Sequence, residues 1–285
     1  MPPVAGTLFL VGTPIGNLGD LTERARQTLA AVDLVAAEDT RRTGRLLAGL
    51  GIDARMISFF EGIEERRIPD ILAKLSEGAD VAVVSDAGMP GLSDPGYRLV
   101  AACVEAGIPV DVIPGPSAVV AALVISGLPT DRFAFEGFLP KSGKARSERL
   151  DAVAGERRTI VLFESPKRVQ ATLRDLVEVA GDREVAVVRE LTKLHQEVIR
   201  GRLTEVLERL GSRELKGEVV LVLAGGGEGA AVDEAEAVRL AGALVRDGAR
   251  KRDAARRISE LTGVPARRIY DGLVVRPSRG VASDG

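Results

Sequence analysis

The 285-residue sequence predicts two α/β domains in tandem, followed by a small helical extension. Three observations support this fold class. Short β-branched runs alternate with segments whose apolar residues recur at helical spacing, loops rich in glycine and proline follow several of these runs, and a hydrophobic content of 45% provides a sizeable core. Strands that alternate with helical segments indicate strand–helix–strand crossover units and a mainly parallel sheet.

Five strands are predicted in the first domain, residues 1–116. They are the runs at 8–13, 34–39, 55–60, 80–86 and 110–115. The segments "LTERARQTLAAV" and "IPDILAKLSEGA" between them have the apolar periodicity of amphipathic helices. In a parallel sheet the loops after these strands emerge at one edge.

The second domain, residues 117–228, is predicted to begin with the apolar helix "SAVVAALVISG". A second series of strands follows it. These strands are the runs at 133–138, 158–165, 184–191 and 218–225. Together with the helical segments between them, they predict a second α/β domain directly after the first.

Residues 229–285 are predicted to form a linker and a basic helical extension. The stretch from Gly225 to Ala237 is rich in glycine and acidic residues, which is typical of a linker. Three helices are expected after it, and the turn between those at 251–263 and 266–274 suits either a helix-turn-helix unit or a small capping bundle. Residues 246–279 carry ten Arg and Lys against four Asp and Glu, while the whole chain has a formal charge of −2. This excess predicts a polyanion-binding segment or a solvated helix face.

The composition of the chain argues against a His/Cys metal site, a membrane span and a signal peptide. One histidine and one cysteine cannot build the usual His/Cys metal sites, so no metal is predicted, and Cys103 is expected to be a buried structural thiol. No apolar run reaches the roughly 18 residues of a membrane span, and the first residues lack the pattern of a signal peptide. A cytoplasmic protein without a membrane partner is therefore expected.

Three loops of the first domain, 12–17, 85–96 and 114–118, follow predicted strand ends. Ligands of open α/β sheets bind at that edge. The spacing of the first loop, "GTPIGN", fits neither standard phosphate motif, and the prolines of these loops remove amide donors. A site with few donors suits an adenosyl group that carries a sulfonium better than a pyrophosphate. A plain strand-to-helix turn remains the alternative for the first loop.

Eight stretches of the sequence, in order along the chain, carry a family resemblance. They are "VGTPIGNLGDLTERA", "AAEDTRRT", "SDAGMPGLSDPG", "PGPSA", "FEGFLPKSGKAR", "FESPKR", "RELTKLHQE" and "GEVVLVLAG". Together they resemble the ribosomal RNA small subunit methyltransferase I family, which has the tetrapyrrole-methylase-like, class III methyltransferase fold. The resemblance implies S-adenosylmethionine-dependent 2′-O-methylation of a cytidine in 16S ribosomal RNA. It also implies 16S ribosomal RNA or the small ribosomal subunit as partner, and a homodimer.

The chain departs from the family pattern in two places. It has "SFFEGIEERR" at 58–67 where the family commonly has a stretch with His and Asn, and it has Met89 where the family commonly has Thr. The first departure argues against a histidine role in that loop. The second implies that no hydroxyl is needed at position 89.

The cofactor is expected against both domains. The loops of the first domain predict contacts from Gly12, Pro14, Gly16, Asp86, Gly88, Met89, Ser117 and Ala118. The resemblance adds Ser165, Leu191 and Ala224 from the second domain.

A ribose hydroxyl needs a group that accepts its proton or stabilises its developing charge. The predicted catalytic residues are Asp39, Glu61 and Lys193, and Glu38, Glu164 and Glu190 are further candidates near strand ends. Each of these side chains can instead cap a helix or form a surface ion pair. Asp39 in particular precedes a helical segment that it could cap.

RNA binding requires cations for phosphates and flat groups for unpaired bases. The predicted cations are Arg41, Arg42, Lys141, Lys144, Arg146, Lys167 and Arg168. Phe59, Phe60 and Phe138 are the stacking candidates, whereas Phe133 and Phe135 alternate along a strand and are expected in the core.

Two rival functions stay open at the level of sequence. One is another class III methyltransferase, acting on a tetrapyrrole or a modified protein side chain. The other is a non-catalytic RNA-binding factor that kept the fold. The basic extension and the loop "FLPKSGKARSER" argue against a compact macrocycle as the sole substrate.

Overall fold

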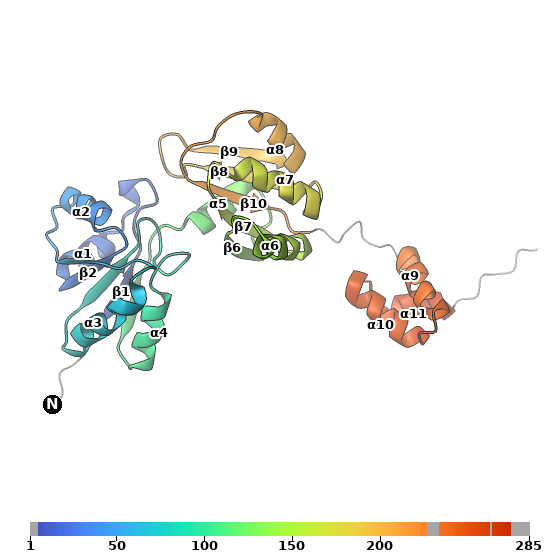
Figure 1. Ribbon diagram of the computed structural model, residues 1–285, viewed down its shortest axis with the longest axis horizontal. Helices are drawn as coiled ribbons and strands as arrows, with labels where there is room; N and C mark the ends of the chain where they lie inside the picture. Colours follow the sequence, from blue (N-terminus) through green and yellow to red (C-terminus); the bar gives the residue numbers. More distant parts are fainter. Residues whose placement is uncertain (1–4, 227–233, 263, 275–285) are drawn as a thin grey trace, which may run out of the picture.

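The computed structural model describes residues 5–226, 234–262 and 264–274. It confirms the predicted α/β fold class, with two five-stranded sheets (Figure 1). A separate group of three helices follows the second sheet. Part of the predicted linker, residues 227–233, lies outside the described residues.

The first sheet is entirely parallel, with the strand order β3-β2-β4-β1-β5. Its strands are β1 (Leu8–Val11), β2 (Leu34–Ala37), β3 (Met56–Ser58), β4 (Val81–Val84) and β5 (Val110–Ile113). The central strands β2 and β4 are buried along their whole length, because helices cover both faces of the sheet. These helices are α1 (Glu23–Ala31), α2 (Thr40–Gly49), α3 (Glu64–Ser76) and α4 (Tyr97–Glu105).

The second sheet is mixed, with the strand order β6-β7-β10-β8-β9. Its strands are β6 (Phe133–Phe138), β7 (Thr159–Glu164), β8 (Glu184–Arg189), β9 (Glu197–Arg202) and β10 (Val219–Leu223). Only β6 and β7 pair in parallel, while β10 runs antiparallel to both of its neighbours. Val219, the first residue of β10, therefore pairs with Glu164, the last residue of β7. The sequence analysis missed β9, whose polar sequence "EVIRGR" lies at a partly exposed sheet edge.

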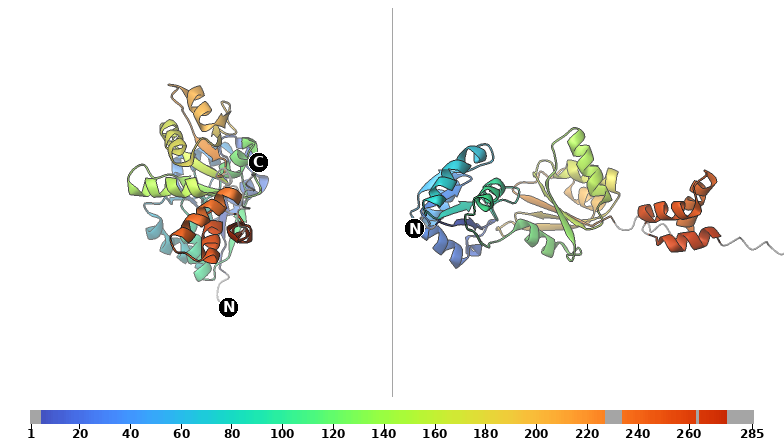
Figure 2. Two further views of the ribbon diagram at one scale, coloured as in Figure 1. Left: turned by 90° about the vertical axis from the view of Figure 1, so that its right-hand side faces the viewer. Right: turned by 90° about the horizontal axis from the view of Figure 1, so that it is seen from below.

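Two layers of helices cover the second sheet. Helix α5 (Ala118–Ser126) packs on one face through Val119, Ala122 and Leu123. Helices α6 (Lys144–Gly155), α7 (Val169–Ala180) and α8 (Leu203–Leu210) pack on the other face (Figure 2).

The three C-terminal helices form their own small core. They are α9 (Glu234–Arg246), α10 (Lys251–Thr262) and α11 (Ala266–Val274). Ala237, Ala254, Ile258 and Ile269 are buried between them. The predicted linker extended too far, because Glu234 already begins α9. Acidic residues in a first helical turn favour the helix, so the acidic composition that indicated a linker belongs here to a helix start.

Candidate functional site

The loops at the carboxyl edge of the first sheet meet as predicted. The backbones of Thr13 and Gly88 exchange two hydrogen bonds of 2.9 and 3.1 Å, which join loop 12–17 to loop 85–96. Gly12 packs against Gly115, and a Cβ atom on Gly12 would lie only 2.6 Å from the Gly115 Cα atom. The opening loop is therefore a backbone junction between three strand ends. Gly12 permits this close approach and is not among the residues that line the larger cavity at this edge.

A cavity of about 370 Å³ lies at this edge and is lined by residues of both domains; because most of the predicted cofactor residues line it, it is called the main cavity below. Seven of the predicted cofactor residues line it: Asp86, Gly88, Met89, Ser117, Ala118, Ser165 and Leu191. Two others, Pro14 and Gly16, line a smaller neighbouring cavity of about 170 Å³ together with Arg42. Asp86 lines both cavities and so connects them.

Ala224 does not belong to this site. It follows the carboxyl end of β10 and lines a different surface hollow, whereas the main cavity is lined by Gly217, Glu218 and Val219 at the start of that strand. The family resemblance had placed Ala224, just after the carboxyl end of β10, beside the cofactor. Because β10 is antiparallel to β7, its first residues take that place.

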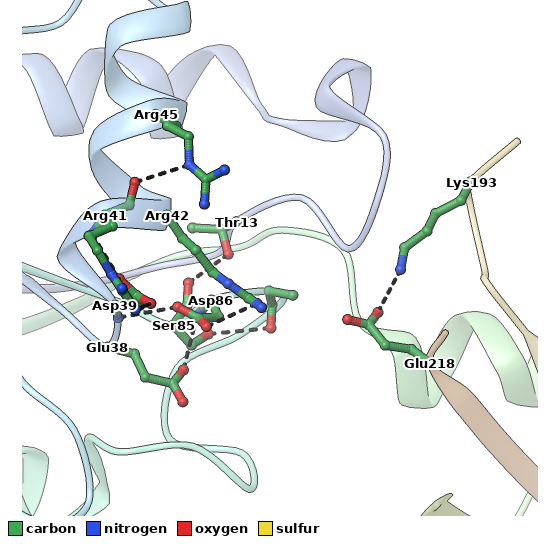
Figure 3. Close-up of polar contacts among 11 residues, drawn as sticks. Thr13, Glu38, Asp39, Arg41, Arg42, Arg45, Ser85, Asp86, Lys193 and Glu218 are labelled. Carbon is green, nitrogen blue, oxygen red and sulfur yellow. Dashed lines mark hydrogen bonds and ion pairs between the residues drawn. The ribbon is translucent and has the colours of Figure 1, made fainter. Parts of the chain in front are cut away.

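Asp86 is the centre of a network between β2, β4 and α2 (Figure 3). Its N–H donates to Glu38 Oε2 at 3.0 Å, and its Oδ1 accepts the N–H of Asp39 at 3.2 Å. Its Oδ2 lies 3.1 Å from Arg42 Nη1. These contacts fix the ends of the two most buried strands of the sheet to each other and to the first turn of α2.

Asp39 caps helix α2, which disfavours its predicted role as a base. Its Oδ1 accepts the N–H of Arg41 at 2.8 Å at the start of α2, and its Oδ2 pairs with the Arg41 guanidinium at 3.0 Å. The hydrogen bond from the Arg41 side chain, together with that from its backbone, lowers the pKa of Asp39 to about 2. A carboxylate with so low a pKa is a weak base at neutral pH.

Lys193 is held between the carboxylates of Glu190 and Glu218, and Figure 3 shows its contact with Glu218. Its Nζ donates to Glu190 Oε1 at 2.9 Å and to Glu218 Oε2 at 3.1 Å. Burial acts to lower the pKa of Lys193, but the hydrogen bonds to Glu190 and Glu218 outweigh it and raise the pKa above its ordinary value. Lys193 is therefore a fixed cation, which disfavours its predicted role as a base.

Glu61, the third predicted catalytic residue, is exposed in the turn before α3 and is not among the residues that line either cavity.

Arg146 and Arg168 were predicted to bind RNA, but the structure ties both to the protein. Arg146 forms a 2.6 Å ion pair with Asp175 and donates to Thr172 Oγ1 at 3.1 Å, and its side chain is only 12% exposed. Arg168 donates to the carbonyls of Leu139 and Pro140 at 3.0 and 3.1 Å. These contacts fix the loop after β6 onto α7.

We expect Arg146→Ala to lower the free energy of unfolding by about 2 kcal/mol, because it removes hydrogen bonds to charged and partly buried partners. Urea denaturation measures this change. Lys144→Ala is the matched control, since Lys144 is 89% exposed and makes one surface ion pair with Glu148; its effect should stay within about 0.5 kcal/mol. Unchanged stability of Arg146→Ala together with weakened RNA binding would restore the original prediction.

The other predicted cations are accessible. Arg41 and Arg42 lie in the first turns of α2, and together with Asp39 and Arg45 they line a surface hollow. Arg45, which the sequence analysis did not select, lies four residues after Arg41 and so faces the same side of the helix. Three lysines, Lys141, Lys144 and Lys167, are exposed in or beside the loops after β6 and β7.

The aromatic predictions hold only in part. Phe138 lines the main cavity, is 59% exposed, and has its ring centroid 5.4 Å from that of Phe163. Phe59 is fully buried in the core of the first domain, so it cannot stack on a base. Phe60 stays accessible. Phe135 packs in the core as expected, whereas Phe133 is 37% exposed near the edge of the second sheet.

Asp94 was not selected from the sequence, although it lies in the loop 85–96 that was. It lines the main cavity. Burial, and then the negative charge of Glu38, raise the pKa of Asp94 to about 6; the charge of Asp86 adds to this rise, and a hydrogen bond with Ser85 opposes it. The raised pKa depends on the proximity of Glu38, Asp86 and Asp94, which follow two different strands and come together when the chain folds. The sequence alone does not show this proximity.

The lining of the main cavity favours a cationic ligand. Among the described residues, the lining contains the carboxylates of Glu38, Asp86, Asp94, Glu164 and Glu218 and neither Lys nor Arg, and the rest of it is largely apolar. Such a surface repels phosphates and attracts a sulfonium or an ammonium group. The residues present therefore fit an adenosyl sulfonium. Among the described residues, no group of His, Cys, Asp or Glu is arranged to hold a metal ion.

The two α/β domains and the acidic cavity between their strand ends define a methylase of the tetrapyrrole type. The sequence model of a family described as tetrapyrrole (corrin/porphyrin) methylases matches residues 7–207, and the chain belongs to this family. It is similar to two curated proteins named ribosomal RNA small subunit methyltransferase I. One, from Thermotoga maritima, is 52% identical over 77% of this chain and 99% of its own length. The other, from Micromonospora olivasterospora, is 48% identical over 96% of this chain and 88% of its own length.

Solved structures give the same fold. A uroporphyrin-III-C-methyltransferase from Thermus thermophilus is 26% identical, with a TM-score of 0.55 over 77% of this chain and 94% of its own. A cobalt precorrin-4 methyltransferase with 19% identity has a TM-score of 0.57. Within the described residues, none of the helices has the length and apolar character that a bilayer span requires.

Proposed function

We propose that the chain transfers a methyl group from S-adenosylmethionine to the ribose 2′-oxygen of a cytidine in small-subunit ribosomal RNA. The observation that carries this proposal is the acidic, partly apolar cavity beside exposed cations of α2 and of the loops after β6 and β7. The cavity suits the sulfonium cofactor, and the cations suit a polyanionic substrate. The names of the relatives support RNA over a tetrapyrrole as substrate. The proposed substrate also implies a cytoplasmic enzyme.

The bound cofactor would supply an electrophilic methyl group at the main cavity. The residues of the chain would hold and orient both reactants. Asp86 and the loop around Met89 would contact the cofactor from the first domain, and Ser165 and Leu191 would contact it from the second. Phe138, exposed at the cavity, would stack on an unpaired base. Alignment of the two reactants can supply much of the acceleration in such a displacement.

Mass-spectrometric mapping of ribosomal RNA from cells with and without the gene tests this function. We expect one cytidine of the small-subunit RNA to lose its ribose methyl group when the gene is absent, and the purified chain with S-adenosylmethionine to restore it. An unchanged RNA together with methylation of a tetrapyrrole would overturn the substrate. A melting temperature that S-adenosylmethionine does not raise would favour a non-catalytic RNA-binding factor, because a ligand of the folded state must stabilise it.

We further propose that the chain forms a homodimer through α5. Val120 and Val124 of this helix are 51% and 66% exposed, although Val119 and Leu123 on its other side are buried against the second sheet. Sedimentation at micromolar concentration should show a dimer, and Val124→Glu should give a monomer because a charge in an apolar interface lacks a partner. Val179→Glu on α7 is the control. A monomeric wild type would contradict this proposal.

A further inference from the structure

The main cavity is lined by five carboxylates, and two of them are held by the network of the first domain. Glu38 accepts the N–H of Asp86 at 3.0 Å. Asp86 accepts the N–H of Asp39 at 3.2 Å and pairs with Arg42 at 3.1 Å. These contacts engage one oxygen of Glu38 and both oxygens of Asp86. Glu38 and Asp86 are therefore committed to joining β2, β4 and α2.

Two more carboxylates are held by the second domain. Glu164 accepts the N–H of Ser165 at 2.7 Å and the hydroxyl of Thr172 at 2.6 Å, and it is 2% exposed. Glu218 pairs with Lys193 at 3.1 Å. These contacts engage both oxygens of Glu164 and Oε2 of Glu218, so both side chains are held by partners within their own domain.

Asp94 is held differently. Its partner is the Ser85 hydroxyl, and within the described parts of the chain its carboxyl has neither a backbone amide nor a cation as partner. The loop that carries Asp94 is fixed nearby, since Gly96 N–H donates to the buried Glu64 at 3.0 Å. Ser93, the preceding residue, has a φ of 61° in the left-handed region. Strained backbone of this kind persists where the surrounding structure holds it, as at functional sites.

We propose that Asp94 is the catalytic base of the reaction given under Proposed function, on which this inference rests. The proton of the ribose 2′-hydroxyl passes to a carboxylate oxygen of Asp94. The freed electron pair of that 2′-oxygen forms the new bond to the methyl carbon, while the carbon–sulfur bond of the sulfonium donor breaks and its electrons remain on sulfur. The neutral thioether leaves, and Asp94 then returns its proton to solvent.

The environment of Asp94 suits this role. A base works best when its pKa lies near the working pH, and the pKa of Asp94 is raised to about 6 by burial and by the charges of Glu38 and Asp86. Asp94 is charged at pH 7 and yet holds a proton more readily than an ordinary aspartate. Asp39, with a pKa of about 2, and the protonated Lys193 lack this property.

The test compares Asp94→Asn with the wild type and with Asp53→Asn, a matched control in the exposed segment before β3. Single-turnover methyl transfer is measured with saturating S-adenosylmethionine and small-subunit RNA. We expect Asp94→Asn to slow transfer by at least about 100-fold, the lower range for loss of a general base. The wild-type rate should rise with pH to a plateau with a midpoint near 6, and the variant should lack that midpoint. Cofactor affinity by calorimetry should change less than about threefold, which separates a base from a cofactor ligand.

Unfolding provides a readout that needs no reaction. The folded-state pKa of Asp94 is raised from 3.8 to about 6, so the folded state binds its proton more tightly than the unfolded state does. The stability that this proton contributes is complete below about pH 4 and is lost as the pH rises through 6. Asp94→Asn should therefore raise the free energy of unfolding at pH 7 and leave it nearly unchanged at pH 4, while Asp53→Asn should change neither.

An active wild type with an equally active Asp94→Asn would overturn the role of Asp94 alone. Loss of cofactor affinity in Asp94→Asn as large as its loss of rate would also overturn it. A wild type that methylates no RNA would overturn the proposed function together with this inference. In that case, unfolding of Asp94→Asn at pH 4 and pH 7 still tests whether the pKa of Asp94 is raised in the folded state.

Discussion

Asp86→Ala is expected to weaken S-adenosylmethionine binding by at least about tenfold while the chain stays folded. Asp86 lines both cavities and makes contacts to Glu38, Asp39 and Arg42 that fix the two central strand ends. Alanine keeps the N–H that donates to Glu38 but loses both carboxylate contacts. The substitution also removes a negative charge that would attract the sulfonium; a hydrogen bond to a charged group contributes about 1.5–3 kcal/mol, and 1.4 kcal/mol corresponds to a tenfold change in affinity.

Calorimetric titration with S-adenosylmethionine measures this effect, and circular dichroism checks that the variant is folded. Asp53→Ala serves as control, because Asp53 is exposed and is not among the residues that line either cavity. Asp86→Asn adds a finer comparison. It keeps an acceptor for the Asp39 N–H but removes the charge that pairs with Arg42, so an intermediate affinity is expected. Unchanged affinity in Asp86→Ala would remove this residue from the proposed cofactor site.

The sequence was sufficient for the positions of the first-domain loops because a parallel sheet has a single carboxyl edge. Once β1, β4 and β5 are predicted as parallel, their following loops must meet, and Asp86, Met89 and Ser117 do line one cavity. The family resemblance placed Ala224 at the same site, but the structure puts it at a different hollow. Strand direction in a mixed sheet depends on pairing partners distant in the sequence, and the hydrophobic run of β10 does not indicate which way the strand runs relative to β7 and β8.

Side-chain partners were the least predictable feature of the site. The position of Arg146 in a basic loop suggested RNA, but Asp175 and Thr172 of α7 hold its guanidinium. Asp94 illustrates the converse case. Its raised pKa arises from burial, from Glu38 after a different strand, and from Asp86 in its own loop, and neither the burial nor the approach of Glu38 can be read from the local sequence. Properties that depend on several strand ends at once require the folded structure.

The C-terminal helices are expected to capture RNA without taking part in the chemistry. The hollow between α10 and α11 is lined by Arg252, Arg256 and Arg267 together with Tyr270, which is 40% exposed. Exposed cations beside an accessible aromatic ring suit an RNA strand with unpaired bases. The Thermotoga maritima relative matches 220 residues of this chain, and this match covers 99% of the relative, which is therefore about as long as residues 5–226 alone. A protein of that length has no room for a comparable extension, which supports an accessory role.

Removal of residues 230–285 should raise the RNA KM and flatten its salt dependence, while the affinity for S-adenosylmethionine stays the same.

The triple variant Arg252→Gln, Arg256→Gln and Arg267→Gln tests the hollow itself. Each phosphate contact contributes a slope of about −0.7 in a plot of log K against log salt for single strands, so loss of three contacts should reduce the slope by about 2. A control with Arg26, Arg98 and Arg209 replaced by Gln removes the same charge from α1, α4 and α8 and should keep the slope. If the truncated chain keeps the salt slope of RNA binding, the C-terminal helices have a structural role only. If truncation abolishes cofactor binding, the helices stabilise the two α/β domains, because the proposed cofactor site lies entirely within residues 5–226.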